Sequence, residues 1–301
     1  MASWQSKVVK MNFRIQRFRG RGTIGIDVAA ERERFESQMA GLKPPEGVSF
    51  TEANVEGRPA LWLDPPVMRH EGALLYLHGG VYLIGSSHAY RSLAAAVAAS
   101  AGMRVLLLDY RLAPEHPFPA AVEDAQAAYH WLLAQDIEPQ QVMVAGDSAG
   151  GGLAMALLLA LRETQQPLPA AALLLSPWVD LMADGGSRVD KAKSDYVLST
   201  ADLHRGATLY LNGADPRTPL ASPICGDLTG LPPLLIQVGS DEILLDDATR
   251  LAEKAQAAGV DVRLEVWQGM FHVWQAVSFF VPEGQQALEE VGRFIDDVYA
   301  A

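Results

Sequence analysis

The stretch Gly146-Asp147-Ser148-Ala149-Gly150 has the residue types and spacing to supply a nucleophile. A short apolar run at 141–145 precedes it, and a longer run rich in helix formers follows at 153–162, which predicts a tight turn between a strand and a helix. Such a turn strains the backbone at the serine and projects its hydroxyl above the sheet. Glycine-flanked serines also cap helices, so the pattern alone is weak, and the strand and helix around it favour catalysis. We therefore expect Ser148 to be a nucleophile.

A serine hydroxyl attacks poorly until a base takes its proton, and the base needs an acid that fixes its tautomer. In the α/β-hydrolase arrangement that this turn indicates, the acid and then the base follow the serine, each in a loop after a strand. Asp241 and His272 meet this condition, because each follows an apolar run by a few residues. The neighbouring Glu242 is expected to point away. The other histidines precede the serine or the acid: His70, His78, His88, His116, His130 and His204.

A second group of glycines follows the predicted buried strand 73–77, in His78-Gly79-Gly80-Val81. Backbone N–H groups can turn toward a reacting carbonyl oxygen only where side chains do not obstruct the approach. This loop is therefore a candidate for the first half of an oxyanion hole, although an ordinary turn at a strand end explains the two glycines equally well.

The remaining pattern predicts one α/β domain with a mostly parallel central sheet flanked by helices. Two alternating segments at 48–55 and 60–63 are expected to form antiparallel edge strands, and buried strands then alternate with helices up to a terminal helix ending near 299. Polar stretches at 181–222 interrupt this rhythm and predict a small helical cap. The expected division is 1–45 for the N-terminal part of the cap, 46–180 with 223–301 for the catalytic domain, and 181–222 for the cap insertion.

The first 26 residues carry basic side chains without an acidic one, interleaved with apolar residues. Such a segment covers another part of the same protein or lies on a membrane surface, and covering the cap is the simpler expectation. The basic residues are Lys7, Lys10, Arg14, Arg17, Arg19 and Arg21.

Composition excludes several classes of function. The net charge of −12 argues against nucleic acid as a partner. No apolar run predicts stable membrane insertion or a secretory signal, so we expect a cytoplasmic location. The single cysteine, Cys225, allows no intrachain disulfide and is expected to be small, partly buried and without a role. The sequence leaves homodimer formation open.

Taken together, these motifs resemble the bacterial hormone-sensitive-lipase-like carboxylesterases of the α/β-hydrolase superfamily, over roughly residues 73–290. The likeness rests on the 78–81 loop, the stretch Asp109-Tyr110-Arg111-Leu112-Ala113-Pro114-Glu115, the turn at 146–151, and the later acid and base. The resemblance implies a serine esterase without a metal or organic cofactor, acting on small esters of short to medium acyl chains. It also implies an oxyanion hole from the N–H groups of Gly80, Val81 and Ala149, with Gly79 permitting the turn.

Two positions depart from the family pattern. Val81 replaces the usual last glycine of the loop and is expected to narrow the acyl pocket, and Val273 follows the predicted base where many relatives have glycine. Tyr82 and Trp178 are further candidates for the pocket wall, although Trp178 could equally be an ordinary core residue. A ligand-binding homologue without catalysis, and amidase, lactonase or thioesterase activity on the same triad, remain alternatives.

Overall fold

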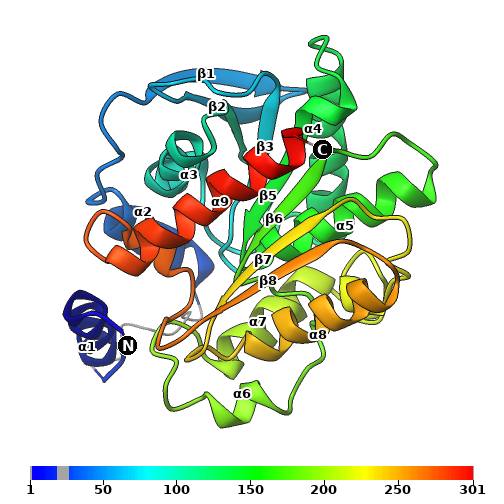
Figure 1. Cartoon of the computed structure of the whole chain (residues 1–301). Helices are drawn as coiled ribbons and strands as arrows, with labels where there is room; N and C mark the ends of the chain where they lie inside the picture. Colours follow the sequence, from blue (N-terminus) through cyan, green and yellow to red (C-terminus); the bar gives the residue numbers. More distant parts are fainter. Residues whose placement is uncertain (1, 19–26, 301) are drawn as a thin grey trace.

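An eight-stranded sheet forms the centre of the molecule in the computed structural model, which describes residues 2–18 and 27–300 (Figure 1). The strand order across the sheet is β1-β2-β4-β3-β5-β6-β7-β8. The strands are β1 (Ser49–Val55), β2 (Arg58–Asp64), β3 (Ala73–Leu77), β4 (Val105–Leu108), β5 (Val142–Asp147), β6 (Ala171–Leu175), β7 (Leu234–Gly239) and β8 (Val262–Trp267). β1 and β2 are antiparallel and form one edge, and the pairs from β4 to β8 are parallel. The predicted α/β-hydrolase sheet is thus confirmed.

The central strands are apolar along their whole length because both of their faces are covered. Every residue of β3, β4, β5, β6 and β7 is buried, as expected for parallel strands between two layers of helices. β1, at the antiparallel edge, is mostly exposed. The carboxyl ends of β5 to β8 therefore lie side by side at one edge of a rigid core, where ligands bind in such sheets.

Two layers of helices sandwich this sheet (Figure 1). One face packs against α3 (Ser87–Ala101) and α9 (Pro282–Ala300). The other face packs against α4 (Ala120–Leu133), α5 (Ala149–Glu163) and α8 (Leu245–Ala257). Three short 3₁₀ helices complete this part: η1 (Pro139–Gln141), η2 (Pro223–Cys225) and η3 (Trp274–Val277). Cys225 is exposed at the end of η2, so the expectation that it is partly buried is wrong.

Four helices lie outside the two layers: α1 (Trp4–Phe18), α2 (Val28–Met39), α6 (Ser187–Asp190) and α7 (Thr200–Leu211). α1 packs with Val9 and Phe13 on a cluster around Phe271 and Trp274, which Val197 of the 181–222 segment also joins. α1 therefore covers part of its own protein, as expected from its amphipathic pattern. Arg19 and Arg21 lie outside the described residues, and none of the described helices is long and apolar enough to cross a membrane.

Candidate active site

Ser148 occupies the turn between β5 and α5 in a strained conformation, with φ 53° and ψ −121°. Its side chain lies in a nearly closed environment, because the residue is only 3% exposed. Glycines around it are required by close backbone packing: a Cβ at Gly150 would collide with the carbonyl of Leu77, and one at Gly152 with the carbonyl of Trp178. The sequence thus builds the turn predicted for a nucleophilic serine.

The carboxylate next to His272 is that of Glu242. Its Oε2 lies 2.7 Å from Nδ1 of His272, and both side chains are buried. Asp241 instead forms an ion pair with Lys10 and keeps about a quarter of its side chain, 26%, exposed. The prediction that Asp241 is the partner of His272 is therefore wrong, as is the expectation that Glu242 points away.

The local hydrogen bonds explain why Glu242 points inward. Its Oε1 accepts from the N–H of Gly239 at 2.6 Å and from the hydroxyl of Ser176 at 2.8 Å. These donors satisfy a carboxylate that burial would otherwise penalise, and they leave Oε2 for His272. The sequence pattern favoured Asp241, the first carboxylate after β7. The side chain of Glu242 is longer by one methylene and turns back toward Gly239 at the end of β7, where it also meets His272.

Ser176 was not among the predicted site residues. It follows β6 with φ 49°, donates to Glu242 and accepts the N–H of Val273 at 3.2 Å. Its hydroxyl therefore joins the loop that carries the acid to the loop that carries His272. The available signal was a polar residue directly after a buried strand that adjoins β5.

The end of β6 also brings the serine and histidine loops together. The N–H of Ser148 donates to the carbonyl of Leu175, the last residue of β6, at 2.9 Å. The N–H of Val273, which follows His272, donates to the hydroxyl of Ser176, which follows Leu175. Ser148 and His272 therefore lie on loops that are bonded to two consecutive residues of one strand end. The arrangement brings a hydroxyl, an imidazole and a carboxylate to the same edge of the sheet.

The surroundings of His272 change the pKa of its imidazole. Burial would lower the pKa of His272, but the hydrogen bond and charge of Glu242 oppose this effect, and Asp195 and Asp147 add to the opposition, so that the net pKa is raised. Asp195 lies in the 181–222 segment, is fully buried and accepts the N–H of Ile243, next to the acid. The charge around the imidazole thus comes from three separate parts of the chain.

The loop predicted to form an oxyanion hole is held from behind by Asp147. Its Oδ1 accepts from the hydroxyl of Tyr76 at 2.9 Å and from the N–H of Gly79 at 3.1 Å. The N–H of Gly79 is thus already used, and a Cβ on Gly79 would collide with the Asp147 carboxylate. Burial raises the pKa of Asp147 to about 6. Asp147 and Gly79 therefore belong to the support of the loop.

The remaining members of the predicted hole have a different environment. The N–H groups of Gly80, Val81 and Ala149 donate no hydrogen bond to any other residue within the described ranges 2–18 and 27–300. Gly80 and Val81 have positive φ values of 110° and 49°. For a β-branched residue such as Val81 this conformation is strained, as is often seen at functional sites.

The predicted pocket residues form two groups. Tyr82 is buried and stacks on Tyr210 of α7, with ring centroids 3.8 Å apart, and Trp178 lies 6.0 Å from the Tyr82 ring. This aromatic cluster joins α7 to the glycine loop. Val273 is half-buried and packs on the α3 and α9 side of the sheet instead. A Cβ at Gly206 of α7 would lie 2.9 Å from Cβ of Val81, so α7 contacts Val81 directly.

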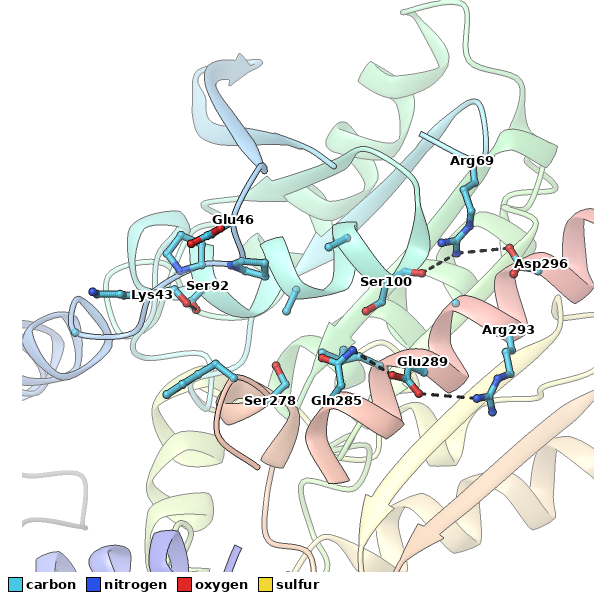
Figure 2. Close-up of a pocket in the computed structure, with 18 residues that line it drawn as sticks. Lys43, Glu46, Arg69, Ser92, Ser100, Ser278, Gln285, Glu289, Arg293 and Asp296 are labelled. Atoms are coloured by element: carbon cyan, nitrogen blue, oxygen red, sulfur yellow. Dashed lines mark hydrogen bonds and ion pairs between the residues drawn. The ribbon is translucent and has the colours of Figure 1, made fainter. Parts of the chain in front are cut away.

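Figure 2 shows a separate groove of about 1160 Å³ between α3, α9 and the segment around Lys43 and Glu46. Its sides carry Arg69 and Asp296, and no residue predicted for the active site lines it. The described part of the chain also holds no group of three or more His, Cys, Asp or Glu side chains placed to bind a metal ion.

Comparisons with known proteins identify relatives with this fold that are named as esterases or hydrolases. Residues 74–276 match the family model described as the alpha/beta hydrolase fold. The chain is 51% identical over 256 residues to an acetyl-hydrolase from Streptomyces hygroscopicus, an alignment that covers 85% of this chain and 83% of the relative. A crystal structure of an esterase from the bacterial hormone-sensitive lipase family superposes with a TM-score of 0.92 at 45% identity and 98% coverage of both chains. A structure of the esterase EstE5 soaked with p-nitrophenyl butyrate superposes with a TM-score of 0.94 at 41% identity and covers 100% of both chains.

Proposed function

This chain belongs to the hormone-sensitive-lipase-like esterases of the α/β-hydrolase fold and is an ester hydrolase, and we propose that it acts through an acyl-enzyme formed on Ser148. The observation that carries the proposal is the buried contact between Glu242 and His272, which Ser176 ties to the strand end that also holds Ser148. A carboxylate, an imidazole and a hydroxyl in series are the groups that activate a serine.

The first half of the reaction transfers the acyl group to the enzyme. His272 accepts the proton of the Ser148 hydroxyl as its oxygen attacks the ester carbonyl, and the carbonyl oxygen becomes an oxyanion. Glu242 keeps Nδ1 of His272 protonated and stabilises the imidazolium. When the intermediate collapses, His272 gives its proton to the leaving alkoxide, and the alcohol departs.

The second half releases the acid. A water molecule gives a proton to His272 and attacks the acyl-enzyme carbonyl, and the proton returns to Ser148 as the carboxylic acid leaves. The N–H groups of Gly80, Val81 and Ala149 are proposed to bind the oxyanion in both halves, since no other described residue occupies them. Gly79 is left out of the hole because Asp147 accepts its N–H.

We further propose short to medium acyl chains as substrates. The buried Val81 side chain stands in the glycine loop and contacts α7, so it reduces the space beside the reacting carbonyl. The name acetyl-hydrolase of the Streptomyces relative and the butyrate ester soaked into EstE5 are consistent with small acyl groups. The segment 181–222 and the N-terminal residues up to 45 are proposed to act as a cap, since α7 stacks on Tyr82 of the same loop.

Two measurements test this function. Ser148→Ala should abolish hydrolysis of p-nitrophenyl esters and labelling by a fluorophosphonate, and it should leave the circular dichroism spectrum unchanged. Among esters from acetate to laurate, the specificity constant kcat/KM should be highest at the short end. Turnover by Ser148→Ala would refute the mechanism, whereas a maximum at laurate would refute only the substrate class.

A non-catalytic ligand-binding role is the competing proposal from another class. Such homologues usually lose a member of the triad, and here the hydroxyl, imidazole and carboxylate are all present. Fluorophosphonate labelling of the wild-type protein separates the two, because only an activated serine reacts. Amide and lactone substrates assayed beside the esters would show how far the pocket restricts the shared chemistry.

A further inference from the structure

The outer face of α1 is apolar, although most of it is exposed at the surface. Trp4, Val8, Met11 and Ile15 are 64%, 50%, 52% and 44% exposed. Their spacing of four, three and four residues places them in one stripe along the helix. The opposite face, with Val9 and Phe13, already packs on the protein. Packing within the protein therefore explains why the inner face of α1 is apolar, but it does not explain why the exposed outer face is apolar too.

Two phenylalanines extend this stripe beyond the helix. Phe280 packs edge-on against Trp4, with ring centroids 5.8 Å apart, and is 39% exposed. The preceding Phe279 is 64% exposed. We call these two residues and the four of the α1 stripe the outer patch. A patch with two phenylalanines and a tryptophan at the surface indicates an interaction site.

The charges along the flank of the α1 stripe are positive, and the one carboxylate close to Trp4, that of Glu283, accepts hydrogen bonds from Ser3. Lys7 and Arg14 are exposed and lie on the same flank of the stripe, since they are separated by seven residues. The α1 sequence contains no aspartate or glutamate, whereas the whole chain carries a net charge of −12. A partner attracted to this flank must therefore be anionic, and it must also accept a row of apolar side chains.

We propose that the outer patch docks on the surface of a bilayer that contains anionic phospholipids. An amphipathic helix in this setting buries its apolar stripe at the boundary of headgroups and acyl chains, while flanking cations contact the phosphates. A second copy of the chain fits less well, because its α1 would bring the same cations to the contact, and the nearby Glu283 is already bonded to Ser3.

This docking would place the catalytic loops next to the lipid. On its inner face, α1 contacts both of these loops: Lys10 pairs with Asp241, beside the acid, and Phe13 packs on Phe271, beside the base, with ring centroids 5.5 Å apart. An ester dissolved in the bilayer would then be close to the active site. The proposal concerns where the protein works and does not depend on the acyl-enzyme mechanism.

Vesicle flotation tests the proposal with the full-length protein. The vesicles are phosphatidylcholine alone or an equimolar mixture with phosphatidylglycerol. The variant Trp4→Ser/Met11→Ser removes apolar contacts, and Lys7→Gln/Arg14→Gln removes the charges. Val67→Ser/Met68→Ser is the matched control, since these two residues are 66% and 49% exposed elsewhere on the surface. The circular dichroism spectrum and the melting temperature report that each variant is folded.

We expect binding to the anionic vesicles that falls at high salt and is weak on phosphatidylcholine alone. Each α1 variant should lower the partition coefficient by about tenfold or more, since two groups are lost in each, while the control binds as wild type. Brominated phospholipid should quench tryptophan fluorescence in the wild type and less in Trp4→Phe. The proposal is overturned if anionic vesicles do not bind, if the α1 variants bind as wild type, or if sedimentation shows a dimer that Trp4→Ser/Met11→Ser dissociates.

Discussion

The carboxylate of Glu242 lies 2.7 Å from Nδ1 of His272, and the carboxylate of the preceding residue, Asp241, pairs with Lys10. Two adjacent acids thus have separate tasks: one faces the buried imidazole, and the other faces the N-terminal helix. The difference follows from their donors: Glu242 accepts from the N–H of Gly239 and the hydroxyl of Ser176, whereas Asp241 accepts from the hydroxyl of Ser240.

The two acids give a matched pair of variants. Glu242→Gln should lower kcat by about a thousandfold or more, because His272 loses the acceptor that fixes its tautomer. Asp241→Asn should keep kcat within a few-fold of wild type, since its side chain contacts Lys10 and not the imidazole. Steady-state hydrolysis of p-nitrophenyl acetate measures both. The opposite ranking would return the acid's role to Asp241.

The pH dependence of kcat/KM should show the raised pKa of His272. The base must be neutral to accept a proton, so activity should fall as the pH drops through that pKa, with a midpoint above the usual histidine value of about 6.5. Asp195→Asn removes a negative charge that raises the pKa, so its midpoint should move to lower pH. Asp184→Asn, on the exposed surface of the same segment, is the control. A midpoint that does not move in Asp195→Asn would exclude this electrostatic contribution.

Ser176 should matter for turnover although it is not a reacting group. Ser176→Ala removes the donor to Glu242 and leaves the N–H of Val273 without its acceptor, so kcat should fall by about tenfold while KM changes little. Ser240→Ala provides the control, because Ser240 makes a similar bridge between Asp241 and Gly269. The acid limb of the pH profile should shift in Ser176→Ala and not in Ser240→Ala. A purely structural Ser176 would lower the melting temperature without moving that limb.

Val81 should set the acyl preference. Val81→Gly removes the buried side chain, so kcat/KM for octanoate relative to acetate should rise by about tenfold. Gly206→Ala places a Cβ 2.9 Å from Cβ of Val81 and should lower the same ratio. Both ratios come from p-nitrophenyl ester series. Equal ratios in all three proteins would show that the acyl chain binds elsewhere.

Much of this architecture could be predicted, because it depends on the periodicity of apolar residues and on the order of the motifs along the chain. The apolar runs identified the strands, and the turn around Ser148 identified the candidate nucleophile from its flanking strand and helix. His272 followed from its place after the last strand. Spacing could not distinguish Asp241 from Glu242, since that choice depends on hydrogen-bond donors from Gly239 and Ser176, which come together only in the folded chain.

The exposed apolar stripe of α1 is a second feature that the sequence pattern alone could not predict. A 3.6-residue pattern predicts which residues share a face, but it does not predict that Val9 and Phe13 form the covered side. It does not reveal that the other side, with Trp4 and Met11, also stays apolar while facing outward. That distinction requires knowing which surface the helix packs on.

The glycines around Ser148 have a practical consequence for protein engineering. Side chains at Gly146, Gly150 or Gly152 would collide with backbone atoms that cannot move aside. Random mutagenesis should therefore yield almost no active clones altered at these three positions. A directed-evolution library gains most by leaving them fixed and by diversifying α7, whose residues face the glycine loop from the outside.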